Sequence, residues 1–375
     1  MASSRRNSST SASIPNSARF LKSYGTDPPV LAVGAAGILL ACLLFIPFGV
    51  WAKGLIGHLS GIPYVRGFEV ETLHDPRDVL LALGDGMAFA ALARDPSLSN
   101  LNAFRGDRNE AALRSERPLE PYIGWILSGG DPHRARSAIV VATLLGAGFA
   151  VAATSELLRQ RGRSPWFALL LLLLPGSLAS LRAFGPELMG FAFIALALVF
   201  DSQQRTWPAV LCFSLAGLSR ETYLLIPLVL AIRERRYLIP HFVWLAWTAV
   251  VWFRFGAWPP TVHLAGTRLL VPPLTGLAHA LSRLQFRPLT IALMTLVPVL
   301  VVAVLDRRRK DPLTRFVVAF GIFSLFLNRV IWVWWASFTR VLLPMFALAL
   351  IALLGEDEHA LTAERLKVDR SQLAP

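Results

Sequence analysis

The sequence predicts an all-α membrane protein, a polytopic transmembrane helical bundle of about ten spans with a long extracytoplasmic first loop containing amphipathic helices. Of its 375 residues, 54% are hydrophobic and only 16% are charged. The mean hydropathy of +0.53 falls in the range of membrane proteins rather than soluble domains. The 11 Trp and 23 Phe fit aromatic belts at the membrane interface and helix packing in lipid.

The N-terminal part of the chain sets the expected orientation. Residues 1–29 are rich in Ser and Arg without an apolar core, which predicts a disordered cytoplasmic tail rather than a signal peptide. Residues 30–52 are uncharged and long enough to form the first transmembrane helix. The basic residues that precede this run favour a cytoplasmic N-terminus. Residues 53–136 then form the extracytoplasmic loop.

The remaining bundle is predicted at 137–354, with a cytoplasmic tail at 355–375. Its apolar runs are 137–157, 166–181, 188–200, 207–218, 223–232, 238–255, 289–305, 316–337 and 341–354. The densest basic loops, at 159–163, 233–236 and 307–310, all fall on the cytoplasmic side of this arrangement. We therefore expect a multi-pass protein of the cytoplasmic membrane with both termini inside. The runs 207–218 and 223–232 are short for spans, which favours tilted or broken helices.

Several classes of function are disfavoured by composition. The net charge of +13 comes from arginines scattered among the spans, so we expect no nucleic-acid partner. Cys42 and Cys212 both lie in apolar runs and predict neither a disulfide framework nor a metal site. The sequence identifies no certain cofactor; a divalent metal stays an open alternative, although the sequence offers it no clear cluster of ligands.

Asp85 is the first candidate for chemistry. This acid stands between Gly84 and Gly86 and begins a run that predicts a half-apolar helix at the outer membrane surface. Phe89 and Leu92 follow it at helical spacing, so the carboxylate shares their apolar face. Partial desolvation would raise its pKa and suit it to act as a catalytic base. The structural alternative is an N-cap, a position that Asp favours.

Three charged groups at span ends lie on the same outer side as Asp85. They are Glu187, the Arg220-Glu221 pair and Arg340. Charges within a span are costly and often functional. Structural alternatives exist for Glu187, as a first-turn acid after a proline, and for Arg340, as a side chain reaching the headgroups. Arg220 and Glu221, adjacent between two short helices, favour the lining of a wet cavity.

The first loop also carries arginines suited to phosphate binding. Arg105 and Arg117 are the candidates, because a guanidinium group offers paired donors to phosphate oxygens. We interpret Arg108 and Arg114 as solvated loop charges.

Five short motifs follow one another along the chain: Asp85-Gly86, Arg114-Ser115-Glu116-Arg117 with Pro118, Pro186-Glu187, Arg220-Glu221-Thr222, and Arg340 with Pro344. Their order resembles the C-type glycosyltransferase superfamily, polytopic enzymes that take sugar from a polyprenyl-phosphate donor. More narrowly, it is similar to bacterial membrane proteins of cell-surface glycopolymer formation. The motifs cover the chain from about residue 60 to residue 350. Met87 and Ala88 stand where the family tends to have aromatics, and Asp85 lacks the adjacent acid that often accompanies it.

The resemblance implies an inverting glycosyltransferase that moves a sugar from a polyprenyl-phosphate donor to a cell-envelope glycan or lipid acceptor at the outer face of the cytoplasmic membrane. It implies Asp85 as the base that accepts the proton of the acceptor hydroxyl. Arg220 and Arg340 would meet the charge of the departing polyprenyl phosphate. Glu187 and Glu221 would orient these arginines or bind sugar hydroxyls. The sequence has no nucleotide-binding glycine loop, which agrees with a lipid-linked donor.

Two other functions stay open at this point. A transporter or flippase of a lipid-linked glycan would share the spans and the outward arginines but would need no base at Asp85. A non-catalytic membrane scaffold would carry the outer charges only as interfacial groups. The partners expected for the enzyme are a polyprenyl-phosphate-linked sugar, a glycan or lipid acceptor, and membrane lipids.

Overall fold

The computed structural model describes residues 28–55, 85–99, 108–259, 270–282 and 288–355. These residues form helices and connecting turns, with one isolated antiparallel bridge between Leu270 and Leu327 and no strand. The prediction of an all-α fold is confirmed for them.

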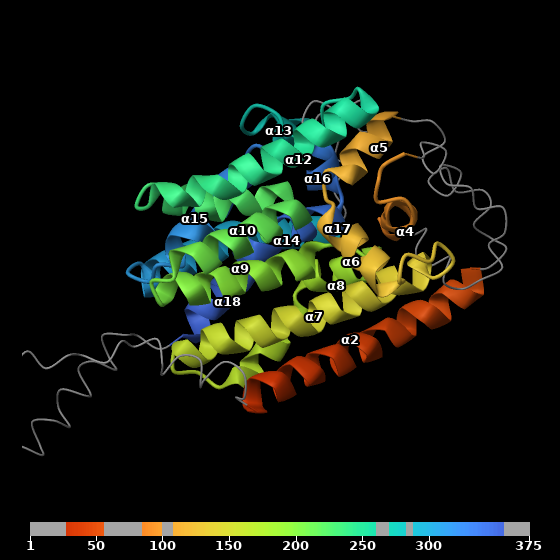
Figure 1. The fold of residues 1–375 in the computed structure, drawn as a ribbon. Helices are drawn as coiled ribbons and strands as arrows, with labels where there is room; N and C mark the ends of the chain where they lie inside the picture. The colour runs from red at the N-terminus through yellow and green to blue at the C-terminus, as the bar shows by residue number, and fades with distance from the viewer. Residues whose placement is uncertain (1–27, 56–84, 100–107, 260–269, 283–287, 356–375) are drawn as a thin grey trace, which may run out of the picture.

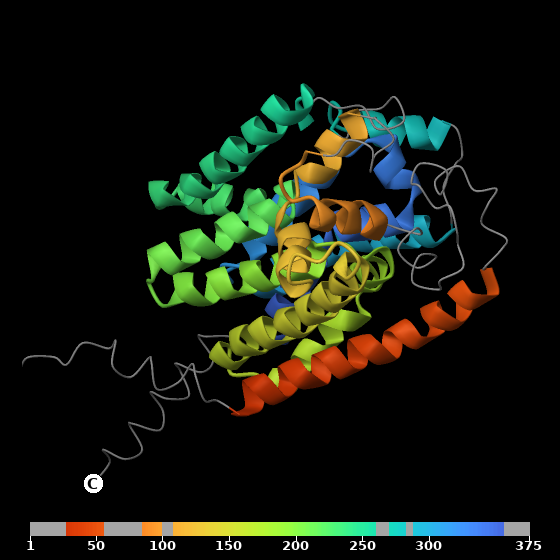
Figure 2. The same ribbon diagram turned by 45° about the vertical axis from the view of Figure 1, so that its right-hand side comes forward.

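Two long helices lie side by side along one edge of the bundle. Helix α2 (Pro28–Leu55) runs next to α7 (Ala135–Gln160), as Figures 1 and 2 show. Glycines on both helices allow this contact. A side chain at Gly148 of α7 would collide with Ile38, and one at Gly37 of α2 would collide with Val151. Both helices cover apolar runs that the sequence predicts as spans.

Helix α7 also packs on α9 (Glu187–Ser202), which in turn packs on α10 (Thr206–Ser219). Gly190 of α9 lies against Tyr223, so a side chain there would displace the Tyr223 ring. Short helices η5 (Glu221–Leu224), α11 (Leu225–Ala231) and η6 (Arg235–Leu238) lead into α12 (Ile239–Phe255), which packs on α10. This order brings the start of α9 close to the end of α10.

Two helix pairs are sharply bent. Helix η4 (Pro165–Leu173) meets α8 (Pro175–Ala183) at 65°, and α17 (Trp335–Val341) meets α18 (Leu343–Leu354) at 60°. Prolines at the start of α8 and α18 explain the breaks, since proline fits the first turn of a helix but not its interior. The halves α8 and α17 pack on each other. The breaks therefore direct these two short helices into the bundle.

The remaining helices close the C-terminal half: α13 (Thr275–Ser282), α14 (Pro288–Arg308), α15 (Thr314–Ser324) and α16 (Arg329–Val333). The run at 316–337, predicted as one span, is divided among α15, α16 and the start of α17. The break has a local cause, because the Asn328 side chain accepts a hydrogen bond from the amide of Val330 at 3.2 Å and so starts a new helix.

Three of the described helices are long and apolar enough to cross a membrane by length and composition: Ala135–Gln160, Arg235–Phe255 and Leu289–Arg308. The number rises to five if each bent pair is one span. The shorter apolar helices are Val30–Phe45, Thr206–Ser219, Glu221–Ala231 and Thr314–Ser324. These helices indicate a membrane protein, while the total of about ten spans stays a prediction.

Helices α4 (Gly86–Arg94), α5 (Arg108–Ser115) and α6 (Leu119–Leu127) form a group at one end of the bundle (Figure 1). The sequence predicts α4 as a half-apolar helix at the outer membrane surface. Its place relative to the membrane stays a prediction, but the expected exposed face is wrong. Every residue of α4 except Ala91 and Arg94 is buried. Helix α4 packs on α6 and α7, so its small and apolar side chains face protein on nearly all sides.

The far end of α7 carries the basic loop predicted to be cytoplasmic. Arg161 forms a two-pronged ion pair with Asp311, at 2.5 and 3.0 Å. Arg163 donates to the carbonyl oxygen of Leu354 at 2.5 Å. These contacts join the loop after α7 to the C-terminal helices, at the opposite end of α7 from α6.

Candidate functional site

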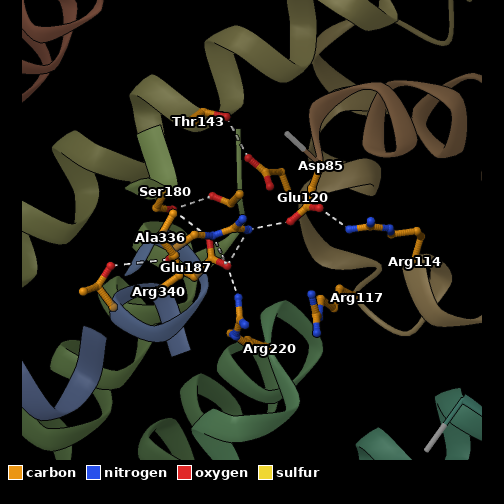
Figure 3. Close-up of polar contacts among 12 residues, drawn as sticks. Asp85, Arg114, Arg117, Glu120, Thr143, Ser180, Glu187, Arg220, Ala336 and Arg340 are labelled. Carbon is orange, nitrogen blue, oxygen red and sulfur yellow. Dashed lines mark hydrogen bonds and ion pairs between the residues drawn. The ribbon is translucent and has the colours of Figure 1, made fainter. Parts of the chain in front are cut away.

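Asp85 is held at the start of α4 by its main chain. Its amide nitrogen donates to the carbonyl oxygen of Ala183 at 2.9 Å, and its carbonyl oxygen accepts from the amide of Phe89 at 3.1 Å. The residue occupies the N-cap position, yet its side chain makes no capping hydrogen bond. The carboxylate instead points toward arginines on other helices (Figure 3). The N-cap alternative therefore describes the place of Asp85 but not the contacts of its side chain.

Two arginines from distant segments contact the Asp85 carboxylate. Arg114 of α5 contacts Oδ1, and Arg340 of α17 donates from Nη2 to Oδ2 at 2.5 Å. The interpretation of Arg114 as a solvated loop charge is wrong, because only 6% of this residue is exposed. Its Nε also donates to Glu110 at 2.7 Å, one helical turn earlier.

Glu187 stands at the first position of α9 and joins the next two arginines. Its Oε1 accepts from Nε of Arg340 at 2.9 Å and also contacts Nη1 of Arg220. Its Oε2 accepts from the hydroxyl of Ser180 on α8 at 2.8 Å. Glu187 is completely buried. A side chain at Gly185 would collide with both Glu187 and Arg340, so this approach needs glycine before α9.

A second ion pair lies next to this cluster. Arg117 donates from Nε and Nη2 to the two oxygens of Glu221, at 3.0 and 2.9 Å. This two-pronged geometry is the strong form of an arginine–carboxylate contact. Glu116 is buried beside it, and burial together with the negative charge of Glu221 raises the pKa of Glu116 above its ordinary value. The charges of Arg117 and Arg220 act in the opposite direction but are weaker.

Glu120 of α6 completes the group and lies beside Thr143 of α7 (Figure 3). Its Oε1 is 2.9 Å from the Thr143 hydroxyl oxygen, and only 1% of the residue is exposed. Burial raises the pKa of Glu120 to about 8, against the opposing effects of the Thr143 hydroxyl and Arg340. Near pH 7 this carboxyl group therefore holds its proton.

The pKa of Asp85 corrects the expectation drawn from the sequence. Desolvation acts to raise this pKa, as expected. The positive charges of Arg114 and Arg340 together outweigh it and hold the pKa of Asp85 well below its ordinary value. The sequence pattern shows the apolar face but not these two partners. In the absence of a ligand, Asp85 is an ionised, paired carboxylate rather than a base with a raised pKa.

The structure brings most of the sequence candidates together. Asp85, Glu187, Arg220 and Arg340 form one connected cluster, and Arg117 with Glu221 lies close enough for its charges to act on Asp85 and Arg220. Arg105 lies outside the described residues. Among the residues that are described, no three or more His, Cys, Asp or Glu side chains are placed to hold a metal ion.

Sequence reasoning missed Arg114, Glu120 and Thr143. Arg114 had a usable signal, since it opens the Arg114-Ser115-Glu116-Arg117 motif. Glu120 follows Arg117 closely but sits after a proline that starts a new helix. Thr143 lies within an apolar run and gives no signal, because a threonine in a helix usually bonds its own backbone.

Removing the Glu187 carboxylate tests the role of this cluster in the fold. Glu187→Ala leaves Arg220 and Arg340 buried without their shared partner, so we expect a loss of about 3–5 kcal/mol in unfolding free energy. The matched control is Asp311→Ala, which breaks the more exposed pair with Arg161 and is expected to cost less. Unfolding of the detergent-solubilised protein can be followed by tryptophan fluorescence. Equal losses in both variants would show that the cluster has no special role in stability.

Comparison of the chain with protein-family models, curated proteins and solved structures finds no significant match. The contacts around Asp85 and Glu187 therefore carry the functional proposal, together with the motif order in the sequence.

Proposed function

We propose that this protein is an integral membrane glycosyltransferase that transfers a sugar from a polyprenyl-phosphate donor to a cell-envelope glycan or lipid acceptor, at the outer face of the cytoplasmic membrane. One observation supports it above the others. Arginines from three parts of the chain gather around two acids: Arg114 and Arg340 contact Asp85, and Arg220 and Arg340 contact Glu187. Arg117 lies close enough for its charge to act on Asp85 as well. Guanidinium groups held in this way suit a phosphate-bearing substrate.

When the donor binds, its phosphate would displace Asp85 from the arginines, while Glu187 would keep its contacts with them. Glu187 is completely buried and holds contacts with Ser180, Arg220 and Arg340. Asp85 keeps 8% exposure, and within the described part of the chain the hydrogen bonds of its carboxylate go to the guanidinium groups of Arg114 and Arg340. In this mechanism Glu187 fixes the position of Arg340, and the arginine exchanges Asp85 for a phosphate oxygen when the donor binds.

This exchange would also prepare the base. Once Arg114 and Arg340 turn to the phosphate, Asp85 loses the positive charges that keep its pKa low, while its burial remains. Its proton affinity then rises only when the donor is in place. A base activated in this way would not require the raised pKa that the sequence predicts for the empty site.

The transfer step uses these groups as follows. The acceptor hydroxyl gives its proton to Asp85 as its oxygen forms a bond to the anomeric carbon of the sugar. The bond from that carbon to the phosphate oxygen breaks, and polyprenyl phosphate leaves with the electron pair. Arg340 and Arg220 meet the charge that develops on the departing phosphate. Attack from the face opposite the phosphate inverts the configuration of the sugar.

Asp85→Asn tests the base. The amide keeps the shape of the side chain but cannot take a proton, so transfer from a panel of polyprenyl-phosphate sugars is expected to fall about 10²- to 10⁴-fold. Asp311→Asn, at the far end of α7, serves as the matched control and should transfer at the wild-type rate. Near wild-type transfer by Asp85→Asn would refute the base. Normal transfer in vitro with loss of surface glycan in cells would instead favour the transporter.

Arg340→Lys tests the leaving-group contact. Lysine keeps the charge but loses the planar fork that spans Asp85 and Glu187, so kcat should fall about 10²- to 10³-fold with a smaller change in KM. Arg161→Lys breaks a comparable two-pronged pair away from the site and should leave both constants unchanged. A purely ground-state role for Arg340 would change KM and leave kcat as it is.

The side of the membrane on which the Asp85 cluster lies can be tested separately. With a rise of about 1.5 Å per residue, Thr143 at the site and the basic loop at Arg161 are about 27 Å apart along α7. The two therefore belong to opposite sides of a bilayer if α7 spans it. A reporter fused after Arg163 is expected to lie in the cytoplasm. An external reporter would place the Asp85 cluster inside and overturn the proposed outer-face reaction.

A further inference from the structure

Glu120 carries a buried carboxyl oxygen that the contacts described so far do not use. The residue lies in the first turn of α6 and is 1% exposed. Its Oε1 is 2.9 Å from the hydroxyl oxygen of Thr143. Its Oε2 is buried and has no hydrogen-bond partner among the residues that the structure describes. A buried polar atom without a partner is unfavourable unless something else occupies the place opposite it.

The distances around Thr143 fit a proton on Oε1 of Glu120. The Thr143 hydroxyl oxygen is 2.9 Å from Glu120 Oε1 and 3.0 Å from the carbonyl oxygen of Ile139. A hydroxyl group has one hydrogen, and an ionised carboxylate and a carbonyl can only accept. With the proton on Oε1, Glu120 donates to Thr143 and Thr143 donates to Ile139. Both short contacts are then satisfied.

Burial favours the neutral form of Glu120 and outweighs Arg340, whose positive charge lowers this pKa more than the negative charge of Asp85 raises it. Burial raises its pKa to about 8. Two charged groups act on it, Asp85 at the start of α4 and Arg340 on α17, and α7 presents the uncharged Thr143 hydroxyl. An ionised Glu120 would add a second negative charge near Asp85, in a site proposed to receive a phosphate. A neutral acid avoids that repulsion.

We propose that Glu120 is a neutral carboxylic acid whose carbonyl oxygen, Oε2, accepts a hydrogen bond from a sugar hydroxyl of the bound donor. This inference rests on the proposed function. With its proton turned to Thr143, the group offers only an acceptor at Oε2. It therefore selects a hydroxyl donor and not an ionised phosphate oxygen, which can only accept. The arginines bind the phosphate and Glu120 binds the sugar.

Two matched kinds of lipid separate the phosphate contact from the sugar contact. Farnesyl phosphate carries the phosphate without a sugar, and farnesyl phosphoryl glucose, mannose and galactose carry both. Binding to the purified protein at pH 7, without acceptor, is measured by tryptophan fluorescence. Glu120→Ala should weaken the sugar-bearing lipid that binds best by about tenfold and change farnesyl phosphate by less than about twofold. Glu120→Gln should bind the sugar-bearing lipid about as tightly as the wild type does. Its NH₂ group can donate to Thr143 while its oxygen takes the place of Oε2.

The dependence on pH provides a test that a merely structural role would not pass. The raised pKa means that the neutral form is present below about pH 8 and is lost as the pH rises through that value. Wild-type affinity for the sugar-bearing lipid should therefore fall about tenfold between pH 7 and pH 9. Glu120→Gln has no proton to lose and should keep its affinity over this range.

The inference is overturned if Glu120→Gln binds as poorly as Glu120→Ala at pH 7, or if Glu120→Ala weakens both kinds of lipid equally. A wild-type protein that binds neither lipid would contradict the proposed function and this inference with it. A measurement without ligand distinguishes a failure of this inference from a failure of the proposed function. Glu120→Gln should lose one of the infrared carbonyl bands of protonated carboxyl groups, while the band expected from Glu116 stays, and the lost band should titrate away in the wild type near pH 8. Absence of that band refutes the neutral acid whatever the substrate.

Discussion

The contact of the Glu187 carboxylate with two arginines holds together the parts of the molecule that matter most for the site. Through Arg340 and Arg220 this one buried group joins the start of α9, the end of α10 and the helix α17, while Ser180 adds α8. A buried guanidinium group is tolerated only when it is paired and hydrogen-bonded. Arg340 also reaches Asp85, so the same interaction fixes the place of α4.

The broken helices explain how charges reach the bundle interior. Both bends, at 65° and 60°, are followed by a proline in the first turn of the second helix. They place Ser180 near the end of α8 and Arg340 near the end of α17, where those two helices pack on each other. Irregular backbone at membrane depth is tolerated where it is buried in protein or lines a cavity. The bends are thus a structural requirement of the site.

Two acids near each other have opposite charge states. Arginines contact both oxygens of Asp85 and hold its pKa low, whereas burial raises the pKa of Glu120 to about 8. Environments that push the pKa values of two neighbouring acids apart often divide their tasks in an active site. In the proposed reaction the ionised acid becomes the base once a phosphate takes its arginines. The neutral acid recognises the sugar.

The amino-acid sequence was enough to predict the helical class, long helices at the apolar runs 30–52 and 137–157, and a helix beginning at Asp85. These features depend on local composition and spacing, which a sequence displays directly. The burial of Arg114, the enclosure of α4 by protein and the opposite pKa shifts of Asp85 and Glu120 come from the packing of distant segments. Asp85 and Arg340 are 255 residues apart in the chain. A pKa depends on charges within a few ångströms, and the bends and packing of distant helices set those distances.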